Sequence, residues 1–202
     1  MKEISLSEEL KKIIDDILEV AKYLWERGWA ERNAGNISVD ITELVSQESN
    51  SFGRFPKRAM KISQPKLAGR CFLVTAAGSR FRDLARQPKK DLLMVSIADK
   101  LDGYHLLWGG EGFRSSPTSE FISHLKIHHF LRQNNFSQKA IVHTHATHLI
   151  ALMHIEQYNR EEALNCLLWA MHPEMKRVLP KGVGFAPYCC PGSEDLADVT
   201  GE

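Results

Sequence analysis

The sequence predicts a three-layer α/β protein whose central sheet is largely antiparallel. The chain has 202 residues, of which 43% are hydrophobic and 25% charged, enough apolar material for a real core. Segments with the three-to-four-residue period of helices are mixed with short apolar runs typical of buried strands. The two kinds do not follow the regular spacing of strand–helix–strand units, which disfavours an all-parallel sheet. We expect a single domain over residues 1–202.

The N-terminal part predicts a long helix followed by a short strand. Apolar side chains recur at three- and four-residue steps over residues 8–27, Ser7 can cap this helix, and Gly28 ends it. Residues 33–36 break the helical pattern, and residues 37–39 then alternate like a strand. The apolar positions of the helix are Leu10, Ile13, Ile14, Ile17, Leu18, Ala21, Leu24 and Trp25.

The rest of the chain mixes strands and helices. Residues 44–66 are polar and broken by Pro and Gly, which predicts a long surface excursion. Thr118 and Ser119 can cap a helix that runs to about Asn134. The other predicted strands are 71–74, 92–97, 104–108, 140–143 and 183–188, and the other predicted helices are 147–155 and 161–171.

Composition argues against several classes of function. Lys and Arg total 26 and Asp and Glu total 25, so the chain lacks the basic excess of proteins that bind nucleic acid electrostatically. No apolar run approaches the ~20 residues of a membrane span, and the N-terminus lacks the apolar core of a signal peptide. Four cysteines without a C-x-x-C pattern fit free thiols. We expect a cytoplasmic protein that binds neither nucleic acid nor membrane.

A candidate metal pair lies at the end of one predicted strand. His143 and His145 are two residues apart, so their side chains point to the same face of the strand. Two imidazoles at this spacing can share one Zn²⁺. The alternative is a pair of surface or packed histidines.

A second candidate segment, Pro117 to Glu120, opens the helix upstream of this strand. Hydroxyl groups and free backbone N–H groups at a helix start suit an anion such as phosphate, and Glu120 lies near the positive end of the helix dipole. An ordinary helix start has the same composition. His124 and His128 follow one turn apart, either as a second metal pair or as packed or solvent-facing histidines.

Taken together, these segments resemble the class II aldolase/adducin family from about residue 23 to residue 195. The order and spacing of many short stretches agree with that family, which is more specific than any single motif. The matching stretches are 28–36, 63–65, 72–75, 103–109, 117–120, 143–147, 168–169, 180–184 and 191–192.

The resemblance implies a zinc-dependent, reversible aldol cleavage with one Zn²⁺ per subunit. The implied substrate is L-rhamnulose 1-phosphate, which would yield dihydroxyacetone phosphate and L-lactaldehyde in rhamnose catabolism. Fuculose 1-phosphate and a non-catalytic or weakly active adducin-like interaction domain are the alternatives. The resemblance also implies the family's three-layer fold and a homotetramer.

The resemblance further implies roles for particular residues. His143 and His145 match two zinc ligands, and Glu120 matches the acid/base. Glu174 matches by spacing a second catalytic glutamate that reaches into a neighbouring subunit's site. The residues that match substrate and phosphate contacts are Asn33, Gly35, Asn36, Ala77, Gly78, Thr118 and Ser119.

Two departures from the family pattern are visible. The turn after residues 72–74 is Thr75-Ala76-Ala77-Gly78, without the serine hydroxyl expected to meet phosphate, so backbone N–H groups of the turn are expected to serve. The family's third zinc histidine lies well beyond residue 192, and the residues up to Glu202 do not include it. We therefore expect a domain truncated at its C-terminus and an incomplete zinc site.

Overall fold

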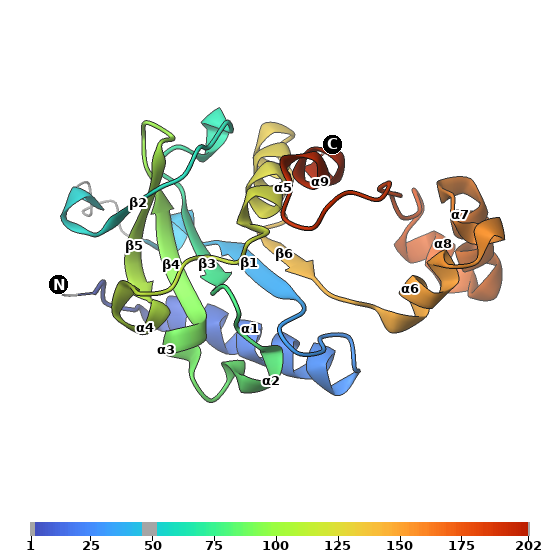
Figure 1. Ribbon diagram of the computed structural model, residues 1–202, viewed down its shortest axis with the longest axis horizontal. Helices are drawn as coiled ribbons and strands as arrows, with labels where there is room; N and C mark the ends of the chain where they lie inside the picture. The colour runs from blue at the N-terminus through green and yellow to red at the C-terminus, as the bar shows by residue number, and fades with distance from the viewer. Residues whose placement is uncertain (1–2, 46–51, 202) are drawn as a thin grey trace.

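The computed structural model describes residues 3–45 and 52–201, and its centre is a six-stranded antiparallel sheet (Figure 1). The strands lie in the order β2-β5-β4-β3-β1-β6, so β2 and β6 form the two edges. All the pairings are antiparallel, as the sequence predicts. The strands are β1 (Asn36–Asp40), β2 (Lys57–Ala59), β3 (Cys71–Thr75), β4 (Leu92–Ile97), β5 (Gly103–Gly109) and β6 (Ala140–His143).

Helices cover both faces of the sheet, which confirms the three-layer prediction. The helix α1 (Glu8–Glu26) lies along one face, and α5 (Phe121–Gln133) lies on the other, with α9 (Glu194–Gly201) packed against α5 (Figure 1). The remaining α-helices are α2 (Phe81–Leu84), α3 (Pro88–Asp91), α4 (Gly110–Phe113), α6 (Thr147–Met153), α7 (Glu161–Met171) and α8 (Pro173–Val178). Short 3₁₀ turns occupy Thr42–Leu44, Phe52–Arg54, Pro65–Leu67 and Glu156–Tyr158.

The alternation of side chains along β3 divides the core in two. Cys71 and Leu73 belong to the cluster under α1, whereas Phe72 and Val74 belong to the cluster under α5. Successive side chains of a strand point to opposite faces, so a strand covered on both faces favours apolar residues at successive positions. This explains the unbroken apolar run at residues 71–74.

The predicted start of α1 is confirmed. The hydroxyl of Ser7 accepts a hydrogen bond from the backbone N–H of Leu10 at 3.2 Å and so satisfies one free donor of the first turn. The helix ends at Glu26, one residue before the predicted end, and Gly28 follows at φ +73°. Of the apolar positions in the helix, Leu10, Ile14, Ile17 and Ala21 are buried, whereas Trp25 is 44% exposed.

Two strand predictions need correction. Residues 183–188 are not a strand but a connection without regular secondary structure, because the apolar pattern alone supplies no neighbouring strand to pair with. Residues 57–59, inside the predicted surface excursion, form β2 by pairing with β5. All three β2 side chains are exposed, so no hydrophobic alternation marks this strand in the sequence.

The helices α6, α7 and α8 stand apart from the sheet. We call residues 147–178 the lobe, and the sheet with α1, α5 and α9 the body. Figure 1 shows the chain leaving the body after β6, forming the lobe, and returning to α9 beside α5. No helix within the described residues is long and apolar enough to cross a membrane.

Candidate active site

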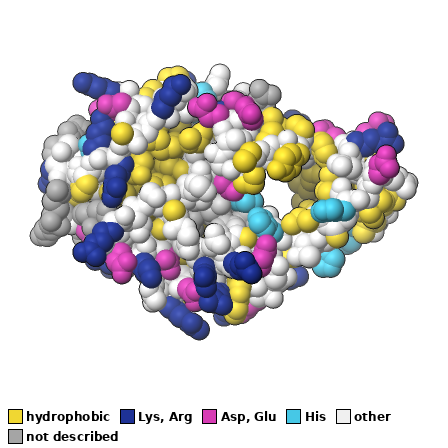
Figure 2. Space-filling model, viewed as in Figure 1, with side chains coloured by type: hydrophobic (Ala, Val, Ile, Leu, Met, Phe, Trp, Pro, Cys, Tyr) yellow, Lys and Arg dark blue, Asp and Glu magenta, His cyan; other side chains and the backbone are white. Residues whose placement is uncertain are grey.

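A cavity of about 480 Å³ opens where β3 and β6 end and β1 begins. Its size falls within the range of small-molecule sites. Figure 2 shows histidine side chains gathered at the rim of the hollow between body and lobe. The cavity is lined by Glu31, Arg32, Asn33, Ala34, Gly35, Asn36, Ala76, Ala77, Gly78, Ser79, Thr118, Ser119, Glu120, His143, His145, Pro191 and Leu196.

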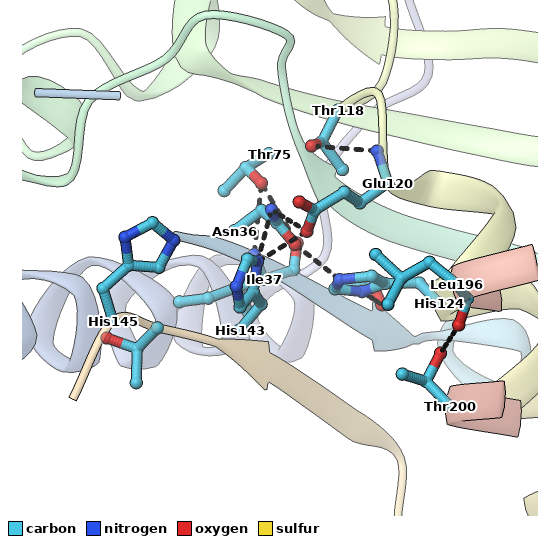
Figure 3. Close-up of polar contacts among 12 residues, drawn as sticks. Asn36, Ile37, Thr75, Thr118, Glu120, His124, His143, His145, Leu196 and Thr200 are labelled. Carbon is cyan, nitrogen blue, oxygen red and sulfur yellow. Dashed lines mark hydrogen bonds and ion pairs between the residues drawn. The ribbon is translucent and has the colours of Figure 1, made fainter. Parts of the chain in front are cut away.

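Strand register and one short bridge position the central residues. The β1–β6 pairing sets Asn36 directly opposite His143. The segment before α5 is joined to the end of β3, where the Thr118 N–H donates to the carbonyl of Thr75 at 2.9 Å and Ala76 bridges Pro117. This bridge places Glu120, the residue before α5, across from His143 (Figure 3).

Glu120 receives two hydrogen bonds at a single oxygen atom. The side-chain amide of Asn36 lies 2.9 Å from Oε2, and Nδ1 of His143 lies 2.5 Å from the same oxygen. The bond from His143 and then that from Asn36 lower the pKa of Glu120 to about 2, although burial acts in the opposite direction. The carboxylate is therefore held in its ionised form.

His145 has a carboxylate partner of its own. Its Nδ1 lies 3.0 Å from Oε1 of Glu31, and its backbone N–H donates to the carbonyl of Trp29 at 2.8 Å. The segment that follows α1 thus positions the end of β6. The rings of His143 and His145 have centroids 5.2 Å apart, which confirms that the two side chains lie on the same side.

These two histidines suit a shared metal ion. When Nδ1 donates to a carboxylate, the lone pair of the neutral ring resides on Nε2, the usual arrangement of a histidine ligand and its outer partner. Both His143 and His145 have this arrangement, with Glu120 and Glu31 as the partners. Among the described residues, no group of three or more His, Cys, Asp or Glu side chains is arranged around a metal position. His143 and His145 therefore suit two of the ligand positions of a metal site.

The Asn-x-Gly-Asn loop needs its glycine. Gly35 has φ +85°, which disfavours other residues, and a Cβ there would come within 3.1 Å of both the carbonyl of His143 and the ring of Phe81. Glycine allows the loop to pass close to β6, so that Asn33 lines the cavity and Asn36 enters the sheet.

The residues predicted to hold phosphate lie together in the same cavity. The residues Thr118, Ser119, Ala77 and Gly78 all line it. The backbone N–H of Ala77 already donates to the carbonyl of Ser116 at 2.8 Å. Arg32, which the sequence did not single out, also lines the cavity.

Glu174 is not brought to this cavity. It is exposed in the first turn of α8, in the lobe, and does not belong to the lining residues. Its predicted role in a neighbouring subunit's site remains a prediction.

Three polar residues around the site were not singled out as functional. Ser38 lies two residues after Asn36 on the buried strand β1, and that polar pair was an available signal. His124 was weighed as a metal ligand or a packed residue, and it is packed, with Nε2 2.5 Å from Oδ1 of Asn36. Glu31 stands within the 28–36 stretch, but nothing in its spacing indicates a contact with His145.

Comparisons with known proteins agree with this arrangement. Residues 15–202 match the family model described as Class II Aldolase and Adducin N-terminal domain. The chain is 40% identical over 192 residues to the rhamnulose-1-phosphate aldolase of Bacteroides thetaiotaomicron, covering 95% of this chain and 70% of that protein.

Solved structures show the same fold. A sugar-phosphate aldolase from Thermotoga maritima matches with a TM-score of 0.71 and 30% identity, over 95% of this chain and 77% of that one. An L-fuculose 1-phosphate aldolase matches with a TM-score of 0.54 and 21% identity, over 96% and 66%, which shows a likeness of fold. With the family model matched over most of its length, the chain belongs to the class II aldolase and adducin N-terminal domain family.

Proposed function

We propose that this protein performs the reversible aldol cleavage of L-rhamnulose 1-phosphate to dihydroxyacetone phosphate and L-lactaldehyde. The observation that carries the proposal is the contact of Glu120 with Asn36 and His143, beside the His143–His145 pair at the wall of one cavity. The choice of sugar is supported by the 40% identity to a rhamnulose-1-phosphate aldolase.

The cofactor in this proposal is one Zn²⁺ per subunit, with His143 and His145 as ligands through Nε2. When bound, the metal supplies Lewis-acid stabilisation of the negative charge that develops as the carbon–carbon bond breaks. Glu31 and Glu120 orient the two imidazoles through their Nδ1 atoms.

Glu120 moves the proton. Aldol cleavage needs a base that accepts a proton from the substrate and an acid that returns one to carbon. A carboxylate held ionised begins as the base, and once protonated it can act as the acid. The side chain is 19% exposed, so it faces the cavity but is largely shielded from bulk water.

The phosphate of the substrate binds in the same cavity. Thr118 and Ser119 contribute hydroxyl groups just before α5, and Gly78 contributes the backbone of a turn with φ +74°. Arg32 contributes a positive charge, and Asn33 an amide. Because the Ala77 N–H is bonded to Ser116, Ala77 contributes shape rather than a donor.

The proposed assembly is a cytoplasmic homotetramer in which Glu174 serves a neighbouring subunit. Glu174 lies on the surface of the lobe, where apolar side chains such as Met171 and Val178 are also exposed. A contact between subunits would cover these apolar groups and bring Glu174 to a cavity other than its own.

The test combines metal analysis with a cleavage assay. We expect the wild type to bind zinc and to release dihydroxyacetone phosphate from L-rhamnulose 1-phosphate faster than from L-fuculose 1-phosphate. His143→Ala should lose both zinc and activity. Glu120→Gln should keep zinc and lose about 10²–10⁴-fold in kcat, the usual contribution of a general acid–base.

Glu43→Gln is the matched control for Glu120→Gln. It makes the same change at an exposed carboxylate outside the cavity and should leave both zinc content and cleavage unchanged. Zinc-loaded wild type that releases no dihydroxyacetone phosphate from either sugar would refute the proposed reaction. Equal zinc in the wild type and His143→Ala would refute the metal assignment.

A further inference from the structure

A chain of buried polar side chains runs from Glu120 into the interior between β1 and α5. Asn36 and Ser38 lie on the same face of β1, and His124 and His128 lie one turn apart on α5. Two residues of a strand advance by about 6.5 Å and four residues of a helix by about 6 Å, so the two pairs match in spacing. Each of the four residues is 6% exposed or less.

The contacts connect these residues in one line. Asn36 Oδ1 lies 2.5 Å from Nε2 of His124, and Nδ1 of His124 lies 2.7 Å from the hydroxyl of Ser38. The Ser38 hydroxyl also lies 2.8 Å from Nε2 of His128. The line therefore runs Glu120, Asn36, His124, Ser38, His128, and its first links are visible in Figure 3.

Hydrogen-bond chemistry gives this line a single direction. Asn36 donates its amide to the Glu120 carboxylate, so its carbonyl oxygen must accept, and Nε2 of His124 must carry the hydrogen. A neutral imidazole then accepts at Nδ1, which takes the hydroxyl hydrogen of Ser38. The Ser38 oxygen is left to accept from Nε2 of His128. Every link has one donor and one acceptor.

The reverse orientation is unfavourable at both ends. If the Asn36 amide were flipped, its carbonyl oxygen would face the Glu120 carboxylate at 2.9 Å. His128 would then carry its hydrogen on Nδ1, which has no hydrogen-bond partner within the described part of the chain. An unpaired buried N–H is costlier and rarer than an unpaired acceptor.

Burial keeps both imidazoles neutral, as this arrangement requires. Burial lowers the pKa of His124 to about 4 and that of His128 to about 3. The ring of His128 also packs against Phe72 at 4.8 Å between centroids, which ties the far end of the line to the core under α5.

We propose that His124, Ser38 and His128 act as positioning residues that lock the Asn36 amide with its N–H groups toward Glu120. The inference rests on the proposed aldolase function, in which Glu120 is the acid/base. Without the lock, Asn36 can rotate and present its oxygen to the carboxylate, which displaces the catalytic group while the cavity wall stays intact. None of the three residues lines the cavity, and their hydrogen bonds reach Glu120 through Asn36.

Two substitutions at one position separate this role from simple packing. In His124→Gln the amide nitrogen reaches about as far as Nε2 and can still donate to Asn36. In His124→Asn the amide reaches only as far as Nδ1, so the donor to Asn36 is lost. We expect His124→Asn to lose about 10–100-fold in kcat with little change in KM, and His124→Gln to recover most of the loss.

His129→Asn is the matched control, since it makes the same change on α5 at a histidine outside the line. It should retain wild-type kcat. The positioning role is overturned if His124→Asn, folded and loaded with zinc, cleaves substrate as fast as the control. It is equally overturned if His124→Gln and His124→Asn lose the same activity.

A spectroscopic measurement on the wild type keeps the test independent of variants that fail to fold. ¹⁵N NMR of histidine-labelled protein distinguishes the two neutral tautomers, and we expect His124 and His128 to carry their hydrogens on Nε2. Hydrogen on Nδ1 of either ring overturns the assigned direction. If the wild type shows these tautomers but cleaves no sugar phosphate, the proposed function fails while the orientation of Asn36 stands.

Discussion

The body and the lobe differ in how completely they bury their apolar side chains. In the body, every residue of β3 and β4 is buried, and Phe72, Leu73, Leu92 and Met94 have no exposed surface. In the lobe, the buried residues among α6, α7 and α8 that the structure describes are Leu164 and Asn165. Exposed fractions there reach 69% at Met171 and 64% at Val178.

This difference separates the parts of the proposed active site. The ligand pair, the acid/base and the residues behind them come from the body, where a double core holds them in place. Glu174 comes from the lobe, where little packing within this chain holds it. A side chain that must move or meet another subunit is better placed in such a region than in a core.

The largest expected contrast comes from deleting one apolar side chain in each region. Phe72→Ala should lower the free energy of unfolding by about 3–5 kcal/mol, because it leaves a cavity between β3 and α5. Met171→Ala should change it by about 0.5 kcal/mol or less, since that side chain is mostly exposed. Urea unfolding monitored by circular dichroism measures both, and comparable losses would contradict the contrast.

A smaller effect is expected from the buried ion pair of the body. Asp40 is bonded to Thr42 and to Arg70, and although burial acts to raise its pKa, these bonds together hold the pKa below its ordinary value. Because the pKa of Asp40 is lower in the folded state, its carboxylate stabilises the folded protein at pH values above the unfolded pKa of about 3.9. This stabilisation is lost as the pH falls through the folded pKa. Asp40→Asn should therefore lower the free energy of unfolding by about 1.5–3 kcal/mol at pH 7.

The matched change is Glu43→Gln, which removes the carboxylate of the exposed Lys139–Glu43 ion pair. It should lower the free energy of unfolding by about 0–1 kcal/mol. The gap between the two variants should close as the pH approaches the folded pKa of Asp40. An Asp40→Asn cost that is independent of pH down to pH 3 would contradict this assignment.

The smallest expected effect is acid destabilisation by the two neutral histidines of the body. His124 and His128 titrate near pH 6.5 when unfolded but only near pH 4 and pH 3 when folded, because burial lowers each pKa. The unfolded state therefore binds more protons below pH 6.5, and stability falls with falling pH. We expect a loss of about 1 kcal/mol per histidine between pH 7 and pH 5.5.

His128→Phe should reduce this dependence, whereas His148→Gln, at an exposed position of the lobe, should leave it unchanged. The measurement is urea unfolding at a series of pH values. A dependence that is equal in the wild type and in His128→Phe would show that folding does not lower the pKa of His128.

Much of the fold could be predicted because most elements carry local signals. The α1 boundaries follow from Ser7 and Gly28, and the strands at 71–74, 92–97 and 140–143 follow from their apolar runs. The wrong strand predictions concern segments whose structure depends on a partner strand rather than on a local signal. Residues 57–59 became β2 only because β5 offered an edge, and residues 183–188 have a strand-like pattern but no partner.

In the candidate site, too, features with a local sequence signal were predicted and long-range contacts were not. The spacing of His143 and His145 correctly predicted that their side chains lie together, although β6 ends at His143 and His145 lies two residues beyond it. The contact of His145 with Glu31 had no such signal, because the two residues are 114 positions apart and meet only through the turn after α1. The role of His124 stayed open between metal ligand and packed residue for the same reason.

By itself, the sequence determined the fold class, the family and many of the residues gathered at the cavity (though not Glu31 or Arg32), because these depend on local periodicity and on motifs in order. The tertiary structure alone decided which atoms meet. Asn36 lies 84 residues from Glu120 and 107 from His143, and their contacts depend on the β1–β6 register and on the rotation of α5 over the sheet. Register and rotation are set by the packing of the whole core, and no local segment encodes them.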